Sequence, residues 1–226
     1  MIKQLVCSMF VMLFLSAGGT AWAEEEKSGT IVIAALKTWV NEWKREVPGT
    51  GRTLSDSIAL VGPAVEVEIN NGPVIEASYL MSVSDYTFTE AGAASEFARR
   101  DFDLAIGKWL NPHVGFFTGY RNSSFKEKEM RANNYSYGMF YTVRGSVPFI
   151  GKSSLYANLT WLDARLKTEG QAREDAPGWI AELGGRTVFT KQIAMRLGYK
   201  WETTKGEVNH VKDSFRGTAL DLTYLF

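Results

Sequence analysis

The sequence predicts an all-β protein, an antiparallel up-and-down β-barrel whose strands cross a membrane. Three observations lead to this prediction. Stretches of about ten residues alternate between apolar side chains and polar or small ones, so each strand has two different faces. Short turns and longer loops alternate along the chain, as in a barrel with two unequal ends. The chain also opens with a segment typical of exported proteins.

Residues 1–23 are predicted to be a signal peptide. Lys3 supplies a positive start, residues 5–15 form an apolar run too short for a transmembrane helix, and Ala21-Trp22-Ala23 is a small-x-small cleavage site. Residues 24–226 are then one domain, because no repeat or linker divides them. Cys7 is the only cysteine and lies in the apolar run, so the mature chain is expected to have no disulfide or thiolate chemistry.

The composition excludes several classes of protein. The formal net charge of zero gives no basic excess for binding nucleic acid. After the signal peptide no apolar run reaches the ~18 residues of a transmembrane helix. Hydrophobic residues make up 45% of the chain and aromatic residues 13%, which suits strands that hide their apolar surface by alternation.

The first segment fits two kinds of structure, and the second has a clear strand pattern. Residues 30–43 fit either a short amphipathic helix or a strand with Lys37, Trp39 and Trp43 on one face. Residues 61–70 alternate clearly, with Glu66 and Glu68 on the polar face, and end in a tight-turn signal, Asn-Asn-Gly.

Further strands follow with the same two-faced pattern. They are expected at 75–84, 100–110, 114–121, 135–144, 155–162, 179–189 and 193–201. In each, one face is apolar and the other carries charges or glycines, as in 193–201, where Leu197 opposes Arg196 and Lys200. The lipid-facing set is expected to include Leu104, Phe116, Leu159, Leu197 and Leu222.

The last strand, 217–226, carries the resemblance to a known class. Leu220, Leu222, Tyr224 and Phe226 share one face, and the chain ends on the aromatic residue. This stretch resembles the C-terminal strand of bacterial outer-membrane β-barrels, which ends in Phe after an alternating apolar series. In that class the assembly machinery reads this strand, so the resemblance implies that Tyr224 and Phe226 are an assembly signal. A soluble all-β domain with an incidental C-terminal Phe is the alternative.

The number of strands follows from the turns. Short turns at 70–72, 111–112, 148–152 and 190–191 would be periplasmic, and the longer loops at 44–57, 90–98, 126–132, 168–177 and 203–213 external. Eight strands follow Gly72, and the strand at 61–70 needs a partner that crosses outward before it. Residues 30–43 are the candidate, which gives ten strands. The alternative is eight strands with residues 24–72 as a periplasmic segment.

The inward faces carry charges of both signs, which we expect to pair as a network that closes a narrow lumen. Its predicted members are Lys37, Glu66, Glu68, Glu76, Asp101, Asp103, Arg121, Arg144, Glu182, Arg186, Arg196, Lys200 and Asp221. The alternative is a narrow polar pore for ions or small solutes.

Catalytic candidates are few. His113 lies in a predicted turn, and His210 precedes Asp213 by three residues in a predicted loop. Neither matches the acidic residues and histidine of omptin proteases or the serine and histidine of a lipid A deacylase. No residues have the spacing of metal ligands or of a phosphate-binding loop, so we expect no catalytic, cofactor or metal site.

The sequence therefore predicts a non-enzymatic outer-membrane barrel of structural or surface-interaction type in a Gram-negative bacterium. Its expected partners are membrane lipid, lipopolysaccharide and the barrel assembly machinery, with no nucleic acid, and the protein is expected to be a monomer. A narrow porin-like channel is the first alternative and a lipid A-modifying enzyme the second. External basic residues are candidates for contact with lipopolysaccharide phosphates: Lys44, Arg45, Arg52, Lys126, Lys128, Arg131 and Arg216.

Overall fold

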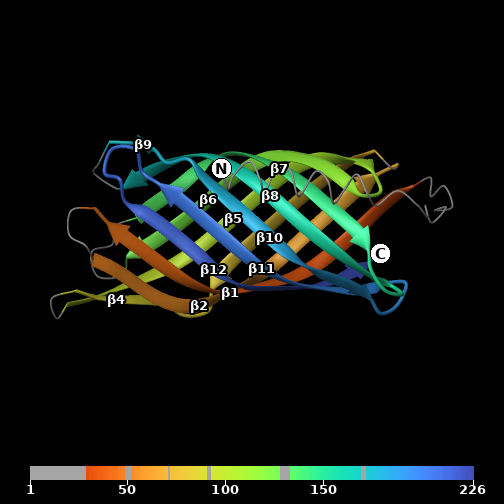
Figure 1. The fold of residues 1–226 in the computed structure, drawn as a ribbon, viewed down its shortest axis with the longest axis horizontal. Helices are drawn as coiled ribbons and strands as arrows, with labels where there is room; N and C mark the ends of the chain where they lie inside the picture. Colours follow the sequence, from red (N-terminus) through yellow and green to blue (C-terminus); the bar gives the residue numbers. More distant parts are fainter. Residues whose placement is uncertain (1–28, 49–51, 71, 91–92, 128–132, 169–171) are drawn as a thin grey trace.

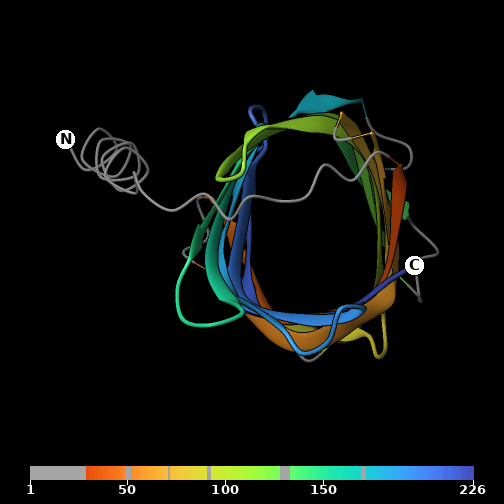
Figure 2. The same ribbon diagram turned by 90° about the vertical axis from the view of Figure 1, so that its right-hand side faces the viewer.

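The structure is a computed structural model that describes residues 29–48, 52–70, 72–90, 93–127, 133–168 and 172–226. These residues form twelve strands, ten of which close into one antiparallel barrel (Figures 1 and 2). The described part of the chain holds no helix with the length and apolar character needed to cross a membrane. The predicted signal peptide, 1–23, lies outside the described residues.

The strands differ widely in length. They are β1 (Thr30–Val47), β2 (Arg52–Ile69), β3 (Pro73–Ser82), β4 (Tyr86–Glu90), β5 (Ala93–Asn111), β6 (Val114–Glu127), β7 (Asn133–Pro148), β8 (Ser153–Thr168), β9 (Glu174–Asp175), β10 (Gly178–Val188), β11 (Ile193–Lys205) and β12 (Lys212–Leu225).

The ring of the barrel is built from neighbours in the sequence and closed by its two ends. Around it the order is β1, β2, β3, β5, β6, β7, β8, β10, β11 and β12, and β12 returns to β1. The closing pair is antiparallel and long, from Ile33 opposite Leu225 to Glu46 opposite Lys212. Two short strands add to the ten: β4 follows β3 along the same neighbour, β5, and β9 pairs with β8.

The barrel has two different ends. Short turns and Phe226 mark one, which we call the C-terminal end; β4, β9 and the longer connections mark the other, which we call the loop end (Figure 1). The ten-strand prediction is confirmed. The eight-strand alternative and the helical interpretation of 30–43 are wrong, because β1 pairs along its length with both β2 and β12.

The strands extend further toward the loop end than predicted. The expected loop at 44–57 shrinks because β1 runs to Val47 and β2 starts at Arg52. Likewise 90–98 contains the end of β4 and the start of β5, and 126–132, 168–177 and 203–213 lose residues to flanking strands. These extensions have no apolar outer face: Lys44, Ser55 and Ser57, for example, point outward. Alternation of apolar residues therefore could not reveal them.

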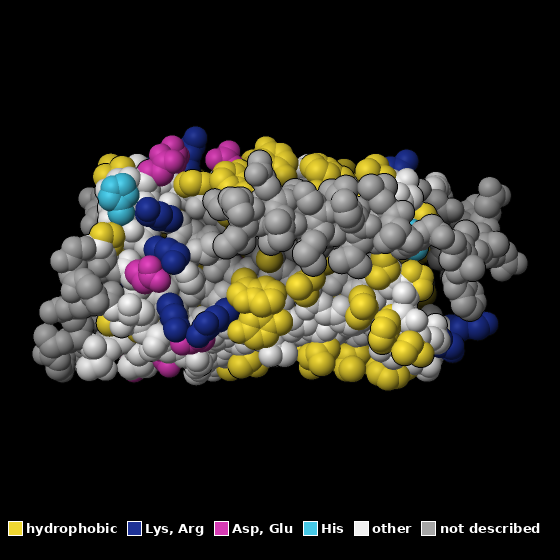
Figure 3. Space-filling model, in the orientation of Figure 1, with side chains coloured by type: hydrophobic (Ala, Val, Ile, Leu, Met, Phe, Trp, Pro, Cys, Tyr) yellow, Lys and Arg dark blue, Asp and Glu magenta, His cyan; other side chains and the backbone are white. Residues whose placement is uncertain are grey.

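The predicted register is confirmed in every strand of the ring. Leu104, Phe116, Leu159, Leu197 and Leu222 are exposed on the outer surface, whereas Trp39 and Trp43 are buried inside the barrel. Figure 3 shows hydrophobic side chains over the middle and the C-terminal end of the visible face, and charged side chains gathered toward the loop end.

Candidate functional site: the lumen of the barrel

An aromatic core fills the lumen at the loop end. At its centre Trp43 is 0% exposed. Five rings surround it with centroids 4.7 to 5.7 Å away: those of Tyr86, Phe88, Phe97, Phe125 and Phe215. Such pairs prefer edge-to-face and offset arrangements, and most of these contacts are edge-to-face or tilted. We call this group, together with Trp39, the plug.

The polar groups of Trp43 and Tyr86 in the plug are hydrogen-bonded, whereas the buried indole nitrogen of Trp39 has no partner among the described residues. The indole nitrogen of Trp43 donates to Oδ1 of Asp213 at 2.8 Å, and the guanidinium of Arg45 holds both oxygens of that carboxylate at 2.8 and 2.9 Å. The hydroxyl of Tyr86 donates to Oδ1 of Asn41 at 2.6 Å, and burial raises the pKa of this phenol. These bonds fix the rings in place, since buried polar groups left unpaired would be costly.

A buried charged cluster lies against the plug. Arg99 is 0% exposed, and its guanidinium carbon lies 4.0 Å from the ring centroid of Phe215. The same guanidinium contacts Asp101 at 2.8 Å and Glu202 at 3.0 Å. Arg121 contacts the same two carboxylates at 3.2 and 2.9 Å. Two arginines thus share two carboxylates, and the cluster joins β5 and β6 to β11 across the lumen.

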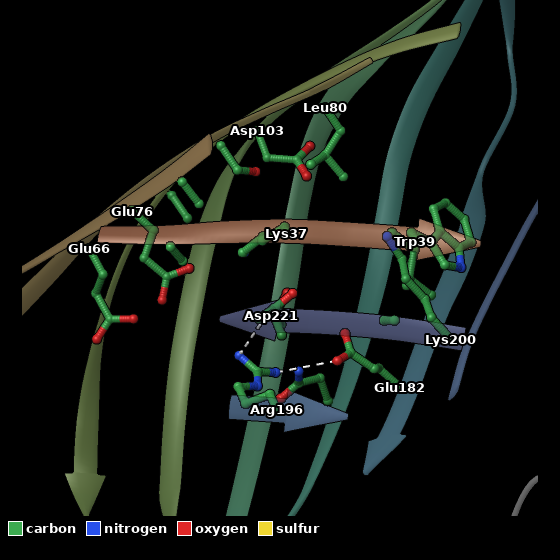
Figure 4. A pocket seen from close by; sticks show the side chains of 18 of the residues that line it. Lys37, Trp39, Glu66, Glu76, Leu80, Asp103, Glu182, Arg196, Lys200 and Asp221 are labelled. Atoms are coloured by element: carbon green, nitrogen blue, oxygen red, sulfur yellow. Dashed lines mark hydrogen bonds and ion pairs between the residues drawn. The ribbon is translucent and has the colours of Figure 1, made fainter. Parts of the chain in front are cut away.

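Below the charged cluster, toward the C-terminal end, the lumen contains a cavity of about 190 Å³. Its charged lining residues are Arg121 and Arg144 together with eight that Figure 4 labels: Lys37, Glu66, Glu76, Asp103, Glu182, Arg196, Lys200 and Asp221. Arg186 also faces inward near the C-terminal end and is exposed. The lumen is therefore open to solvent on this side of the described barrel, whereas the plug closes the other side.

Ion pairs cross the cavity wall. Arg144 holds both carboxylate oxygens of Glu76 and lies over the ring of Phe117, with 3.8 Å between the guanidinium carbon and the ring centroid. Arg196 contacts Glu182 at 3.3 Å and Asp221 at 3.7 Å, as the dashed lines in Figure 4 show. These pairs place most of the cavity's charge in contact with an opposite charge.

A tyrosine packs against two charged residues of the cavity wall, Glu182 and Arg196. Tyr156 donates from its hydroxyl to Glu182 at 2.7 Å and lies over Arg196, with 4.2 Å between the guanidinium carbon and the ring centroid. A β-carbon at Gly198 would lie 2.2 Å from this hydroxyl, and one at Gly184 would lie 2.7 Å from it. The two glycines therefore make room for the ring.

The structure places all the predicted network residues on inward faces, but it does not bring all of them together. Asp101, Asp103, Arg121, Glu76, Arg144, Glu182, Arg196 and Asp221 form ion pairs with one another. Lys200 lies 4.0 Å from Glu202 and 4.0 Å from the ring centroid of Trp39. Among the described residues, Lys37, Glu66, Glu68 and Arg186 form no ion pair.

The most deeply buried charges were missed from the sequence. Arg99 lies between the predicted loop 90–98 and the predicted strand 100–110, and Glu202 lies between the predicted strand 193–201 and the predicted loop 203–213, so neither was assigned to an inward face. A signal for both existed, because Arg99 has the parity of Asp101 and Glu202 that of Lys200. Extending each inward-facing series by two residues would have found them, because alternate residues of a strand point to the same face.

The two histidines lie at opposite ends of the barrel. Nδ1 of His113 lies 3.0 Å from the carbonyl oxygen of Ser146, close to the turn between β5 and β6. His210 is exposed in the connection between β11 and β12, with a φ of 55°. Asp213 is bonded to Trp43 and Arg45 instead of to His210. The described residues include no group of three or more side chains placed to hold a metal ion.

Comparison with known proteins gives a match in structure alone. No protein-family model and no curated protein sequence matches the chain. The outer membrane protease OmpT from Escherichia coli superimposes with a TM-score of 0.61 at 13% identity, over 93% of this chain and 100% of that one. This is the fold of the bacterial outer-membrane β-barrels.

Other outer-membrane barrels align with lower scores. The translocator domain of the autotransporter NalP from Neisseria meningitidis has a TM-score of 0.44 at 12% identity, over 98% of this chain and 94% of that one. An outer membrane channel from Pseudomonas putida F1 has a TM-score of 0.43 at 14% identity, over 92% and 99% of the two chains.

The outer face has the features that an outer-membrane barrel needs. Aromatic pairs lie at two heights: Trp161 with Trp179, 4.5 Å apart between centroids, toward the loop end, and Tyr224 with Phe226, 4.9 Å apart, at the C-terminal end. Exposed aliphatic side chains such as Leu197 lie between them. Girdles of aromatic residues on both sides of an apolar band are typical of transmembrane barrels.

Proposed function

We propose that the protein is an integral outer-membrane barrel of structural or surface-interaction type, without catalytic activity and with a closed lumen. The apolar outer face and the shared fold support insertion in the outer membrane of a Gram-negative bacterium after removal of residues 1–23. The loop end then lies outside the cell and the C-terminal end in the periplasm. The strand extensions rise above the membrane, where their polar outer faces meet water.

The plug is the observation that carries the proposal. Trp43 and Arg99 are fully buried in the described barrel, so side chains pack around them on all sides in the outer half of the lumen. A conducting pore needs a continuous aqueous path, and wide channels belong to barrels of about 16–18 strands. A ten-stranded barrel is close in size to the barrels of about eight strands whose interior is filled by side chains, and here the outer half is filled.

A narrow channel is the second candidate, and the cavity favours it. The C-terminal half of the lumen is polar and open to solvent, so ions would meet only one barrier, the plug. Conduction would require the plug to move, and the bonds of Asp213 to Trp43 and Arg45 oppose such a movement.

A lipid A-modifying enzyme or an omptin-like protease is less well supported. The likeness to OmpT is one of fold at 13% identity. An enzyme needs a nucleophile or base held in a cleft by a partner. Asp213 already has two other partners, and His113 lies at the far end of the barrel, so neither histidine belongs to such a set.

The proposed partners are lipid, lipopolysaccharide and the assembly machinery, with the protein as a monomer. Tyr224 and Phe226 stay the proposed assembly signal at the end of β12. Of the basic residues proposed to meet lipopolysaccharide, Lys44 and Arg216 pair with Glu42, and Arg45 pairs with Asp213. Lys126 is exposed and forms no ion pair with a described residue, whereas Lys128 and Arg131 lie outside the described residues.

Planar bilayer recording tests the closed lumen. Purified wild-type protein should give at most small, rare conductances, whereas the double variant Trp43→Ala/Phe215→Ala should open more often because it empties the centre of the plug. Phe189→Ala, which shortens an exposed ring on the outer face, is the matched control and should stay silent. Steady, ion-selective openings from wild-type protein would overturn the proposal in favour of the channel.

A further inference from the structure

The cavity contains a pair of like charges that the fold does not neutralise. Glu66 on β2 lies directly opposite Glu76 on β3, and both face the lumen. Like charges at directly opposite positions of an antiparallel pair are destabilising. Arg144 binds both oxygens of Glu76, and no described residue forms an ion pair with Glu66. Figure 4 shows the two carboxylates near each other at the edge of the cavity.

The charges around Glu66 add to this imbalance. The described cavity wall below the charged cluster has three cations, Lys37, Arg144 and Arg196, and four anions, Glu66, Glu76, Glu182 and Asp221. Lys37 acts electrostatically on Glu66, Glu76 and Glu182 but contacts none of them as an ion pair. The charged cluster above is balanced, with Arg99, Arg121 and Lys200 against Asp101, Asp103 and Glu202. Arg186, which faces inward near the C-terminal end, acts electrostatically on Glu66 but forms no ion pair with it. Glu66 is therefore left without a contacting cation in a half-enclosed space, where an unpaired charge is costly.

A bound metal ion does not suit the unpaired carboxylate of Glu66. Calcium takes six to eight oxygen ligands, and magnesium demands a near-octahedral shell. Glu66 offers one free carboxylate, because Glu76 is held by Arg144 and the described residues include no group of three or more potential metal ligands. The cavity is also much larger than one ion.

We propose that the cavity binds a small organic ammonium ion whose charged group pairs with Glu66. A ligand of a few heavy atoms fits the volume, and Ser78, Thr142 and Asn158 in the lining can hydrogen-bond to a polar body. Entry is from the C-terminal end, since Arg186 is exposed there and the plug closes the other side. This route of entry rests on the closed lumen proposed above, whereas binding itself does not.

Isothermal titration calorimetry of the full-length mature protein in detergent micelles tests the proposal. Ethanolamine, as its chloride, is the probe, and sodium acetate of equal ionic strength is the control ligand. Wild-type protein should bind ethanolamine and not acetate. Glu66→Gln keeps the size of the side chain and removes its charge, and should weaken ethanolamine binding by about tenfold or more. Glu68→Gln is the matched control, because Glu68 is inward-facing but does not line the cavity, and should bind as the wild type does.

Three results would overturn the proposal: no heat of binding with ethanolamine, equal binding of acetate, or unchanged affinity in Glu66→Gln. Migration of unheated samples on a gel shows whether each variant is folded. If Glu66→Gln does not fold, the comparison of ethanolamine with acetate on wild-type protein still shows whether the cavity binds an ammonium ion selectively. The bilayer recordings judge the closed lumen separately, so a conducting protein that binds ethanolamine would refute the proposed function and keep the ligand site.

Discussion

Arg99 shows how this barrel holds a full charge without solvent. Its guanidinium is surrounded by Phe215, Asp101 and Glu202, so two anions and an aromatic face replace the lost water. Arginine suits such a place because its planar group makes several bonds at once and stacks on rings. Replacing one partner of a buried pair leaves the other charge uncompensated, which costs far more than the pair itself contributes.

Arg99→Met should therefore strongly destabilise the protein. The change keeps a long apolar side chain but leaves Asp101 and Glu202 to Arg121 and Lys200, and we expect the free energy of unfolding to fall by about 3–5 kcal/mol. Urea unfolding in lipid vesicles, followed by tryptophan fluorescence, measures it. Arg165→Met is the control, since its pair with Asp175 is exposed and its loss should change little. Equal stability of the two variants would mean that the buried cluster is not needed to hold the plug.

Single residues also show what the sequence could and could not reveal about the lumen. The inward position of Arg196 or Asp101 follows from parity alone. Which charges meet does not, because partners such as Arg99 and Glu202 lie on β5 and β11, on different sides of the ring. Their contact depends on strand tilt and on closure of the barrel, which no local pattern contains. Glu66 and Lys37 were expected to belong to the network of paired charges, and neither forms an ion pair with a described residue.

Each strand divides into a segment with an apolar outer face and an extension without one. In β11, Leu197 and Tyr199 are exposed on the outer face, whereas Thr203 near the loop end is polar. The apolar segments could be predicted because contact with lipid demands an unbroken apolar face. The extensions could not, since water on their outer side accepts any polar residue. Strand ends were accordingly predicted well at the C-terminal end and several residues short at the loop end.

Leu197→Arg tests the register of β11. Leu197 is 51% exposed on the outer face, so arginine would enter lipid, and the free energy of unfolding should fall by about 2–4 kcal/mol. The same urea titration measures it. Val208→Arg places the same residue in the exposed connection between β11 and β12 and should cost little. If both substitutions were tolerated equally, Leu197 would not face lipid.

At the scale of the whole molecule, closure and filling act together. The pairing of β12 with β1 removes the sheet edges that would otherwise attract other strands. Closure also places the inward faces of ten strands around a narrow space, which the plug fills at one end and the cavity leaves open at the other. The two ends of the lumen therefore differ, and the proposed function places the plugged loop end at the cell surface and the open cavity toward the periplasm.

Cysteine labelling tests this orientation in intact cells. The mature chain is predicted to have no cysteine, so a single introduced thiol reports its own position. Val208→Cys lies at the loop end, where the native side chain is 78% exposed, and a membrane-impermeant maleimide should label it from outside. Lys191→Cys lies in the exposed turn between β10 and β11 at the C-terminal end and should be labelled only after the outer membrane is permeabilised. The reverse pattern would place the plug toward the periplasm and the open cavity toward the medium. Entry of an ammonium ligand would then be from outside the cell, so this measurement fixes the side on which the barrel meets its solutes.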